Sequence, residues 1–186
     1  MAFSQKILPA SVNMKEFERF LKSDYEIGIF LELHISQLKY VAAMAKAEGK
    51  KMIYHVDLIQ GLKSDDYATE YLCQEYQPFG LISTKANVIQ KAKQRGVVSI
   101  QRMFLIDSHA LEKSYKLIER TKPDYIEVLP GIAPWMITEV KERLGIPIFA
   151  GGLIRTREDV EKALKAGAEG ITTSDTELWE AFLEKK

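Results

Sequence analysis

The chain has 186 residues, of which 46% are hydrophobic and 28% are charged. These proportions are typical of a soluble globular protein with one sizeable core, and we expect a single domain over residues 1–186. The 26 basic and 26 acidic residues cancel, which excludes nucleic-acid binding through overall positive charge and leaves only local patches for such a partner.

Eight short runs along the chain have the length and the β-branched or aromatic content of strands. In chain order they are KILPA, EIGIFL, KMIYHVDL, FGLIST, VVSIQRMF, YIEVLP, PIFAGG and GITTS, beginning at Lys6, Glu26, Lys51, Phe79, Val97, Tyr125, Pro147 and Gly170. Their starts lie 18 to 28 residues apart, and this nearly regular spacing leaves room for a helix after each run.

Helical patterns fill the intervals. Residues 35–48 and 158–166 each place alanine, valine and leucine on one stripe. The predicted helix ends are glycines, which adopt the left-handed conformation without a Cβ penalty: Gly49, Gly96, Gly145 and Gly167. The predicted N-caps are Ser64, Asp107 or Ser108, Thr156, and Ser174 in a capping box with Glu177.

Eight alternating strand and helix units predict a parallel sheet, because each right-handed crossover returns the chain alongside itself. Eight units suit closure into a small, single-domain (β/α)8 barrel of the TIM type. The first run is the weak point, because KILPA is short and contains Pro9. An open, doubly wound sheet is therefore the alternative.

In a barrel, functional groups gather at the C-terminal strand ends, and the two-residue period of a strand sorts its side chains between the interior and the helices. In YIEVLPG, Ile126 and Val128 are expected to face the helices, so Glu127 points into the barrel. The same reasoning places His55 and Asp57 on one face with Ile53, near the end of their strand.

In VVSIQRMF, the same alternation predicts that Val98 and Ile100 face outward and that Gln101 faces inward with Ser99. Asp57, Gln101 and Glu127 are therefore expected to converge on the barrel mouth, where they would recognise the hydroxyl groups of a ligand. The alternative is a polar layer whose members satisfy one another, since buried carboxylates need partners.

The seventh and eighth runs end in AGG and TTS. Loops after these strands frequently bind phosphate in barrels, together with the N-terminus of a short helix. The predicted phosphate site is Gly151, Gly152, Thr173 and Ser174, because glycine lets an anion approach the backbone and the hydroxyls donate to it. The alternative reading of Gly-Gly is a simple turn, and Asp175 places a negative charge beside the expected anion.

Arg102 and Lys85 are candidate ligand-binding cations at strand ends. Lysine there could form a Schiff base, as in barrel aldolases, or be a solvated loop charge. Three histidines without a helical i, i+4 pair argue against zinc, whereas magnesium through Asp57 and Glu127 stays open. The usual nucleotide, dinucleotide and serine-hydrolase signatures are absent from the sequence.

The compartment is indicated by three features. The single cysteine, Cys73, excludes an intrachain disulfide and fits a reducing environment. The first residues lack the apolar run of a signal peptide, and the longest apolar stretches are too short to span a bilayer. We expect a cytoplasmic protein with no membrane partner.

Six stretches together resemble the glycerol-3-phosphate-responsive antiterminator family: YHVDLIQGLKSDDYA, LISTKANVIQKAK, SIQRMFLIDSHAL, PDYIEVLPG, PIFAGGLIRTREDV and ALKAGAEGITTSDTELW. The resemblance covers nearly the whole chain in the same order. It implies a bacterial barrel that binds glycerol 3-phosphate as an effector and acts on the mRNA leader of glycerol uptake genes, so that transcription continues past a terminator. It implies a regulator with no catalytic residue and no cofactor. The run ITTS departs from a Ser-Thr-Ser-like run but keeps its hydroxyls.

The residues alone leave two other classes open. One is a barrel enzyme acting on a small phosphorylated substrate, such as an isomerase, an aldolase or a glycerol-phosphate transferase, because fold does not determine function. The other is a ligand sensor whose output is a protein partner. The candidate RNA patches are Lys91, Lys93 and Arg95 on one helix, and Arg155 with Arg157 near the glycine loop. The sequence also leaves open whether the chain forms a homo-oligomer.

Overall fold

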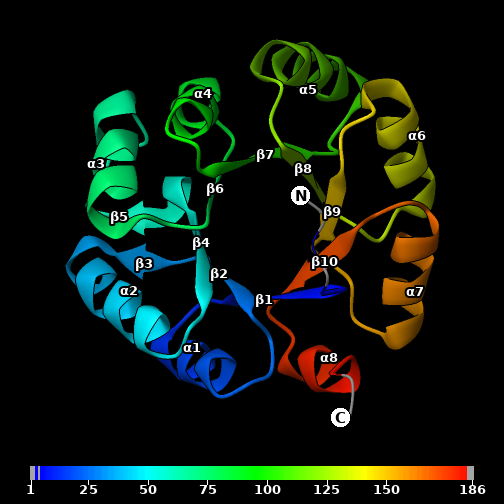
Figure 1. Cartoon of the computed structure of the whole chain (residues 1–186). Coiled ribbons are helices and arrows are strands. Elements are labelled where there is room, and N and C mark those ends of the chain that lie inside the picture. Colours follow the sequence, from blue (N-terminus) through cyan, green and yellow to red (C-terminus); the bar gives the residue numbers. More distant parts are fainter. Residues whose placement is uncertain (1–2, 4, 184–186) are drawn as a thin grey trace.

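A computed structural model describes residue 3 and residues 5–183 of the chain. In this part of the chain, eight parallel strands form a closed barrel in the order β1-β10-β9-β8-β7-β6-β4-β2 (Figure 1). They are β1 (Ile7–Ser11), β2 (Ile27–Phe30), β4 (Lys51–His55), β6 (Gly80–Ser83), β7 (Val98–Phe104), β8 (Tyr125–Leu129), β9 (Ile148–Gly151) and β10 (Gly170–Thr173). Seven of these strands lie within the predicted runs and β1 extends one residue beyond its run, to Ser11, so the TIM-type barrel is confirmed.

The first strand closes the barrel despite its proline. Residues 7–9 pair with β10, beginning with Ile7 opposite Ile171. Ala10 then pairs with Ile29 of β2. Pro9 removes one backbone donor, but β1 has a hydrogen-bonded neighbour on each side and all five of its residues are buried. The open-sheet alternative is therefore wrong.

Eight α-helices in the described part of the chain surround the strands (Figure 1). They are α1 (Met14–Leu21), α2 (Leu38–Ala47), α3 (Asp66–Tyr76), α4 (Ala86–Gln94), α5 (Ser108–Thr121), α6 (Pro134–Leu144), α7 (Arg157–Lys165) and α8 (Thr176–Ala181). None of the described helices is both long enough and apolar enough to cross a membrane.

The helix starts follow the predicted chemistry, with two shifts of one residue. Thr156 caps α7 in a capping box, and Asp107 caps α5. At α3 and α8 the cap is the aspartate that follows the predicted serine: Asp65 accepts from Ala68 N, and Asp175 accepts from two amides of α8. A carboxylate caps the helix and also interacts favourably with the positive end of the helix dipole, which a serine hydroxyl does not.

The two faces of the barrel strands pack in two different hydrophobic clusters, one between the sheet and the helices and one inside the barrel. Ile126 and Val128 belong to the layer between the sheet and the helices, as predicted. Ile100, however, belongs to the cluster inside the barrel together with Ile53 and Phe149. The predicted orientation of β7 is therefore wrong. Both faces of a parallel barrel strand are buried, so alternation defines two faces without showing which one is inside.

The N-terminal end of the barrel interior is filled with aromatic rings. Tyr125 and Phe149 stack with their centroids 4.7 Å apart and their planes within 3°. Phe3 packs edge-on against both rings at 4.9 Å, and against Phe79 at 5.6 Å. These rings occupy the interior on this side, so a small ligand has room only toward the opposite, C-terminal end.

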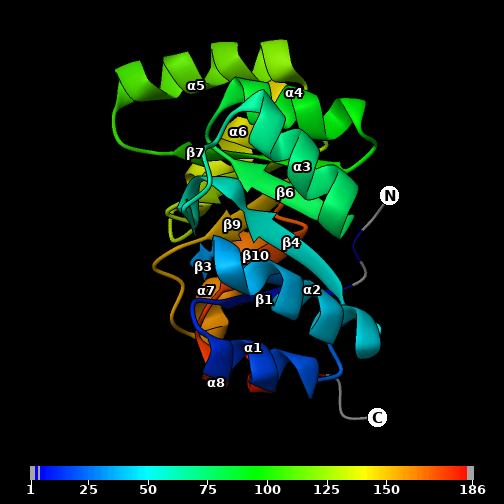
Figure 2. The same cartoon turned by 90° about the vertical axis from the view of Figure 1, so that its left-hand side faces the viewer.

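Two short strands that the sequence reading did not predict lie in the loops after β2 and β4. They are β3 (Leu33–His34) and β5 (Ile59–Gln60), which form a separate parallel pair next to the short 3₁₀ segments η1 (Ile35–Gln37) and η2 (Val56–Leu58). Two-residue strands lack a repeating pattern that sequence periodicity could detect. Seen from the side of α2 and α3, these two helices lie next to each other over β4 (Figure 2).

Candidate functional site

Three polar side chains are bonded to one another at the C-terminal end of the barrel interior. Glu127 of β8 is only 1% exposed. Its Oε2 accepts from Arg102 Nε of β7 at 2.6 Å, and its Oε1 accepts from Thr172 Oγ1 of β10 at 2.7 Å. The prediction that Glu127 faces the barrel interior is confirmed. Because both oxygens accept hydrogen bonds, the cost of burying this carboxylate away from water is offset.

Gly151 makes the bond between Thr172 and Glu127 geometrically feasible. Strand β9 lies between β8 and β10, so the two side chains reach each other across the position of Gly151. A Cβ on Gly151 would lie 2.2 Å from Thr172 Oγ1 and 3.4 Å from Glu127 Oε1. The first glycine of AGG is thus explained by a side-chain contact between its neighbouring strands.

Arg102 presents unused donors to the barrel mouth. Its side chain is 10% exposed, and its Nε is fixed on Glu127. Its two terminal nitrogens form no hydrogen bond with any described residue. A guanidinium whose Nε is held by a carboxylate still offers its terminal nitrogens for a second anion, and phosphate fits that donor pattern well.

His55 is the residue of the mouth that the sequence reading left out of the ligand site. It is 2% exposed, and neither Nδ1 nor Nε2 has a hydrogen-bond partner among the described residues. Burial, followed by the nearby charge of Arg102, lowers the pKa of His55 to about 4, although Glu127 and Asp57 act in the opposite direction. The imidazole is therefore neutral near pH 7, with one donor and one acceptor available for a ligand.

A sequence signal for His55 did exist. The alternation in KMIYHVDL placed it on the face of Ile53, and Ile53 lies in the inner cluster. The ladder agrees, because His55 pairs with Ile82 of that same cluster. Among the described residues, no three of His, Cys, Asp and Glu form a group that could hold a metal ion.

Asp57 links the loops after β4 and β6. Its carboxylate accepts from Ser83 Oγ at 2.5 Å, and from the backbone N and Oγ1 of Thr84, each at 2.7 Å. Burial raises the pKa of Asp57, but these hydrogen bonds outweigh that effect and hold the pKa below its usual value. Asp57 lies beside the mouth, yet three of its roughly four lone-pair sites are occupied. Its clearest effect is to hold the two loops together.

The predicted phosphate residues occupy two different settings. Gly152 has a φ of 75°, a left-handed conformation that favours glycine. Ser174 is exposed, and its hydroxyl has no partner among the described residues. Thr173 shares the strand face of Ile171, which packs in the layer toward the helices. Its hydroxyl accepts from the backbone N of Asp175 at 3.1 Å. Within TTS, Thr172 is the residue that reaches the interior.

Gln101 lies on the wrong side of β7 for the role we predicted. It is 1% exposed; its Nε2 donates to the Ser83 carbonyl at 3.2 Å, and its Oε1 lies 3.4 Å from Thr121 Oγ1 of α5. The reversed face of β7 places it between sheet and helix, while Arg102 takes the inward position. Lys85 precedes α4 and is exposed. The structure thus brings Arg102, Glu127 and Gly151 together, and it removes Gln101 from the mouth.

These features define a class: a (β/α)8 barrel with a polar mouth, in which a buried arginine–glutamate pair lies beside a glycine-containing loop. Residues 7–179 match the family described as glycerol-3-phosphate responsive antiterminator. The chain belongs to this family.

Two solved structures and one curated protein are similar to this chain. The chain is 47% identical to the glycerol uptake operon antiterminator regulatory protein of Listeria monocytogenes, whose crystal structure it matches with a TM-score of 0.94 over 96% of each chain. An antiterminator-related protein of Thermotoga maritima matches with 27% identity and a TM-score of 0.83, over 95% of this chain and 98% of that one. The YgcP protein of Escherichia coli is 32% identical over 78% of this chain and 76% of its own length.

A more distant match shows the fold alone. A deoxyribose phosphate aldolase of Aeropyrum pernix has 15% identity and a TM-score of 0.71, over 95% of this chain and 89% of that one. The shared barrel does not carry the aldolase activity to this chain.

Proposed function

We propose that this protein is a cytoplasmic glycerol-3-phosphate sensor that acts on the mRNA leader of glycerol uptake genes and promotes transcription past a terminator. Family membership over residues 7–179 supports the regulatory role. The single structural observation that carries the ligand assignment is the Arg102 guanidinium, which Glu127 holds through Nε and whose terminal nitrogens bond to no described residue. An anionic effector supplies the acceptors that this group lacks.

The ligand assignment divides the mouth into two parts. The phosphate lies between Arg102 and the loops after β9 and β10, near Gly152 and Ser174. Gly151 keeps the neighbouring space free of a side chain. The glycerol hydroxyls bond to Glu127 and to His55, whose neutral ring both donates and accepts. A small phosphorylated polyol thereby supplies partners to the His55 ring and to the terminal nitrogens of Arg102, which have none among the described residues.

The regulatory reading is favoured over an enzyme by the setting of the lysine. A Schiff-base lysine is activated by desolvation or by a neighbouring cation. The side chain of Lys85 is exposed, and it is the backbone N of this residue that donates a hydrogen bond to Ser83 Oγ. We therefore assign Lys85 the role of a cation near the mouth that attracts the anionic ligand through solvent. Asp57, with its three internal hydrogen bonds, fixes the loop that carries Lys85.

Titration calorimetry with glycerol 3-phosphate, glycerol and inorganic phosphate tests the ligand site. We expect glycerol 3-phosphate to bind more tightly than either fragment. Arg102→Gln should weaken binding of glycerol 3-phosphate by about 10- to 150-fold, since charge-assisted hydrogen bonds contribute roughly 1.5–3 kcal/mol. Lys113→Gln on α5 is the control, because Lys113 is exposed on the helix surface. Equal weakening by both variants would remove Arg102 from the site.

The regulatory output is tested by titrating a leader transcript with and without the ligand. Coupling of about 1–3 kcal/mol predicts transcript binding that is roughly 5- to 150-fold tighter with glycerol 3-phosphate present. Phosphorus NMR of the ligand over the same incubation monitors turnover. Equal transcript affinity in both conditions would contradict the proposal, and a new phosphorus signal that depends on Glu127 would favour the enzyme alternative.

A further inference from the structure

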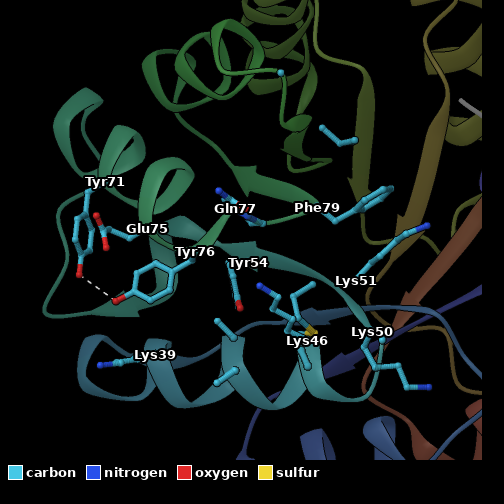
Figure 3. Close-up of a pocket in the computed structure, with 18 residues that line it drawn as sticks. Lys39, Lys46, Lys50, Lys51, Tyr54, Tyr71, Glu75, Tyr76, Gln77 and Phe79 are labelled. Carbon is cyan, nitrogen blue, oxygen red and sulfur yellow. Dashed lines mark hydrogen bonds between the residues drawn. The ribbon is translucent and has the colours of Figure 1, made fainter.

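The structure has a large groove away from the barrel mouth. It lies between α2 and α3, has a volume of about 990 Å³, and extends to the N-terminal ends of β4, β6 and β7 (Figure 3). Its floor contains Met52 and Tyr54 of β4, and its α2 wall consists largely of small residues such as Ala42. This volume is at the upper end for a ligand pocket, and the open shape suits a segment of a polymer.

We propose that this groove is the binding surface for a single-stranded segment of RNA. The proposal rests on the function proposed above and assigns it a location. The groove is lined by four lysines, Lys39, Lys46, Lys50 and Lys51, and by one acidic residue, Glu75. This local excess of positive charge occurs in a chain whose net charge is zero, and it complements a phosphate backbone.

Two of these lysines are free to bind phosphate. Lys39 and Lys46 are exposed on α2, and neither ammonium has an ion pair or hydrogen bond with any described residue. Lys50 donates to two backbone carbonyls, and Lys51 pairs with Glu26 at 2.6 Å. Glu26 compensates the charge of Lys51, whereas Lys39 and Lys46 are available for direct contact.

Three of the five basic residues in the patches that the sequence indicated form ion pairs. Lys91 and Arg95 both pair with Glu70 on α3. Arg157 of α7 pairs with Glu161 at 3.2 Å, and its guanidinium lies over the Phe182 ring. Lys93 donates to the Lys122 carbonyl, and Arg155 is exposed with no side-chain partner among the described residues. The structure favours the α2–α3 groove over both patches because two lysines that pair with no described residue lie there together with aromatic rings.

Aromatic rings supply the second element of single-strand recognition. Tyr71 and Tyr76 of α3 lie across the groove from Lys39 (Figure 3), with their rings edge to face at 5.6 Å and their hydroxyls 3.0 Å apart. Tyr71 is 41% exposed, and Phe79 lines the same groove. Unpaired bases stack on such rings, while lysines hold the phosphates between them.

The groove and the ligand site share strand β4. Tyr54 faces the groove, and the next residue, His55, faces the barrel mouth. The groove residues 76–79 lead directly into β6, which ends at Ser83, and the Asp57 carboxylate joins that end to the loop after β4. A ligand that shifts His55 and Asp57 therefore moves strands that form the groove, which gives a physical route for coupling.

The test is a titration of a fluorescent leader transcript at several salt concentrations, with glycerol 3-phosphate present. The variant Lys39→Glu/Lys46→Glu should bind the transcript at least about tenfold more weakly, and the slope of log affinity against log salt should fall by about 1.4, because each single-strand phosphate contact contributes roughly 0.7. The matched control is Lys113→Glu/Lys116→Glu on α5, which makes the same charge change at two other exposed helix lysines. It should bind like the wild type.

A second pair of variants tests the aromatic element. Tyr71→Ala should weaken transcript binding by about 5- to 150-fold, since stacking contributes roughly 1–3 kcal/mol per base. Tyr71→Phe retains the ring and should therefore retain the affinity. Circular dichroism and glycerol 3-phosphate calorimetry check that each variant is folded. Wild-type affinity in both the lysine and Tyr71→Ala variants, or equal loss in the α5 control, would overturn the groove proposal while leaving the sensor function intact.

Two further outcomes separate the alternatives. If the wild type binds glycerol 3-phosphate but no transcript, both the groove proposal and the RNA output are overturned. A poly-glutamate peptide serves as a probe for an acidic protein partner. If the peptide binds through Lys39 and Lys46 and the transcript does not, the groove accepts an acidic protein segment and the RNA assignment is wrong.

Discussion

The two ends of the barrel interior are built from the same strands but differ in chemistry. At the N-terminal end, Phe3, Tyr125 and Phe149 fill the space with contacting rings. At the C-terminal end, Glu127 is bonded to two neighbours, and His55 has no partner among the described residues. Tyr125 and Glu127 are two residues apart on one strand. One end is satisfied by its own packing, whereas the other retains polar groups without partners among the described residues.

The largest predicted effect concerns the aromatic end. Phe149→Ala should lower the free energy of unfolding by about 3–5 kcal/mol, because it removes a fully buried ring that is packed against two others. Chemical denaturation measures this loss. The affinity of the remaining folded protein for glycerol 3-phosphate should fall less than in Arg102→Gln, because the ring makes none of the hydrogen bonds of the mouth, although Phe149 is the ladder partner of Glu127. A large loss of affinity in folded Phe149→Ala would show that the two ends are not separate.

The second prediction uses the unpartnered histidine. The folded pKa of about 4 lies below the ordinary value of 6.5, so the unfolded chain binds the proton more readily. The free energy of unfolding therefore has its full value, as far as His55 is concerned, above pH 6.5. It decreases as the pH falls toward 4, by up to about 3 kcal/mol. The free energy of unfolding of wild type and His55→Gln, measured at several pH values, should differ in this window. Parallel curves would contradict a neutral buried His55.

The third prediction concerns Gly151. Gly151→Ala should cost about 1–3 kcal/mol in stability, because the new methyl group collides with Thr172 Oγ1 and breaks its bond to Glu127. Ligand affinity should fall as well. In a Thr172→Ala background the clash disappears, so the same substitution should cost less. Denaturation of the four proteins in this double-mutant cycle measures the coupling; strictly additive costs would show that the bridge does not explain the glycine.

The smallest predicted effect tests whether Gln101 contributes to stability alone and not to ligand binding. Gln101→Leu removes two long hydrogen bonds between β7 and its surroundings and should cost about 1 kcal/mol in stability. Calorimetry should show the wild-type affinity for glycerol 3-phosphate, because the side chain lies outside the barrel. A marked loss of affinity in a stably folded Gln101→Leu would restore the original prediction for this residue.

Much of the fold followed from local rules. The eight strand runs predicted the eight barrel strands, because each run carries its own β-rich composition and its own turn or helix signals. The orientation of Glu127 also followed, since apolar neighbours flank it on both sides. The orientation of β7 did not: Val98, Ile100 and Met103 are all apolar, and in this strand an arginine takes the inward position while a glutamine lies under α5.

The sequence by itself determined the order of elements, the barrel class and the set of polar residues at the strand ends, because these depend on composition and period within one strand. The tertiary structure decided which of those residues meet. Thr172 reaches Glu127 only because β9 passes between them with a glycine at the crossing point. His55 has no partner among the described residues because of what the other strands place around it. Contacts between strands depend on register across the barrel, and a single strand carries no record of its neighbours' register.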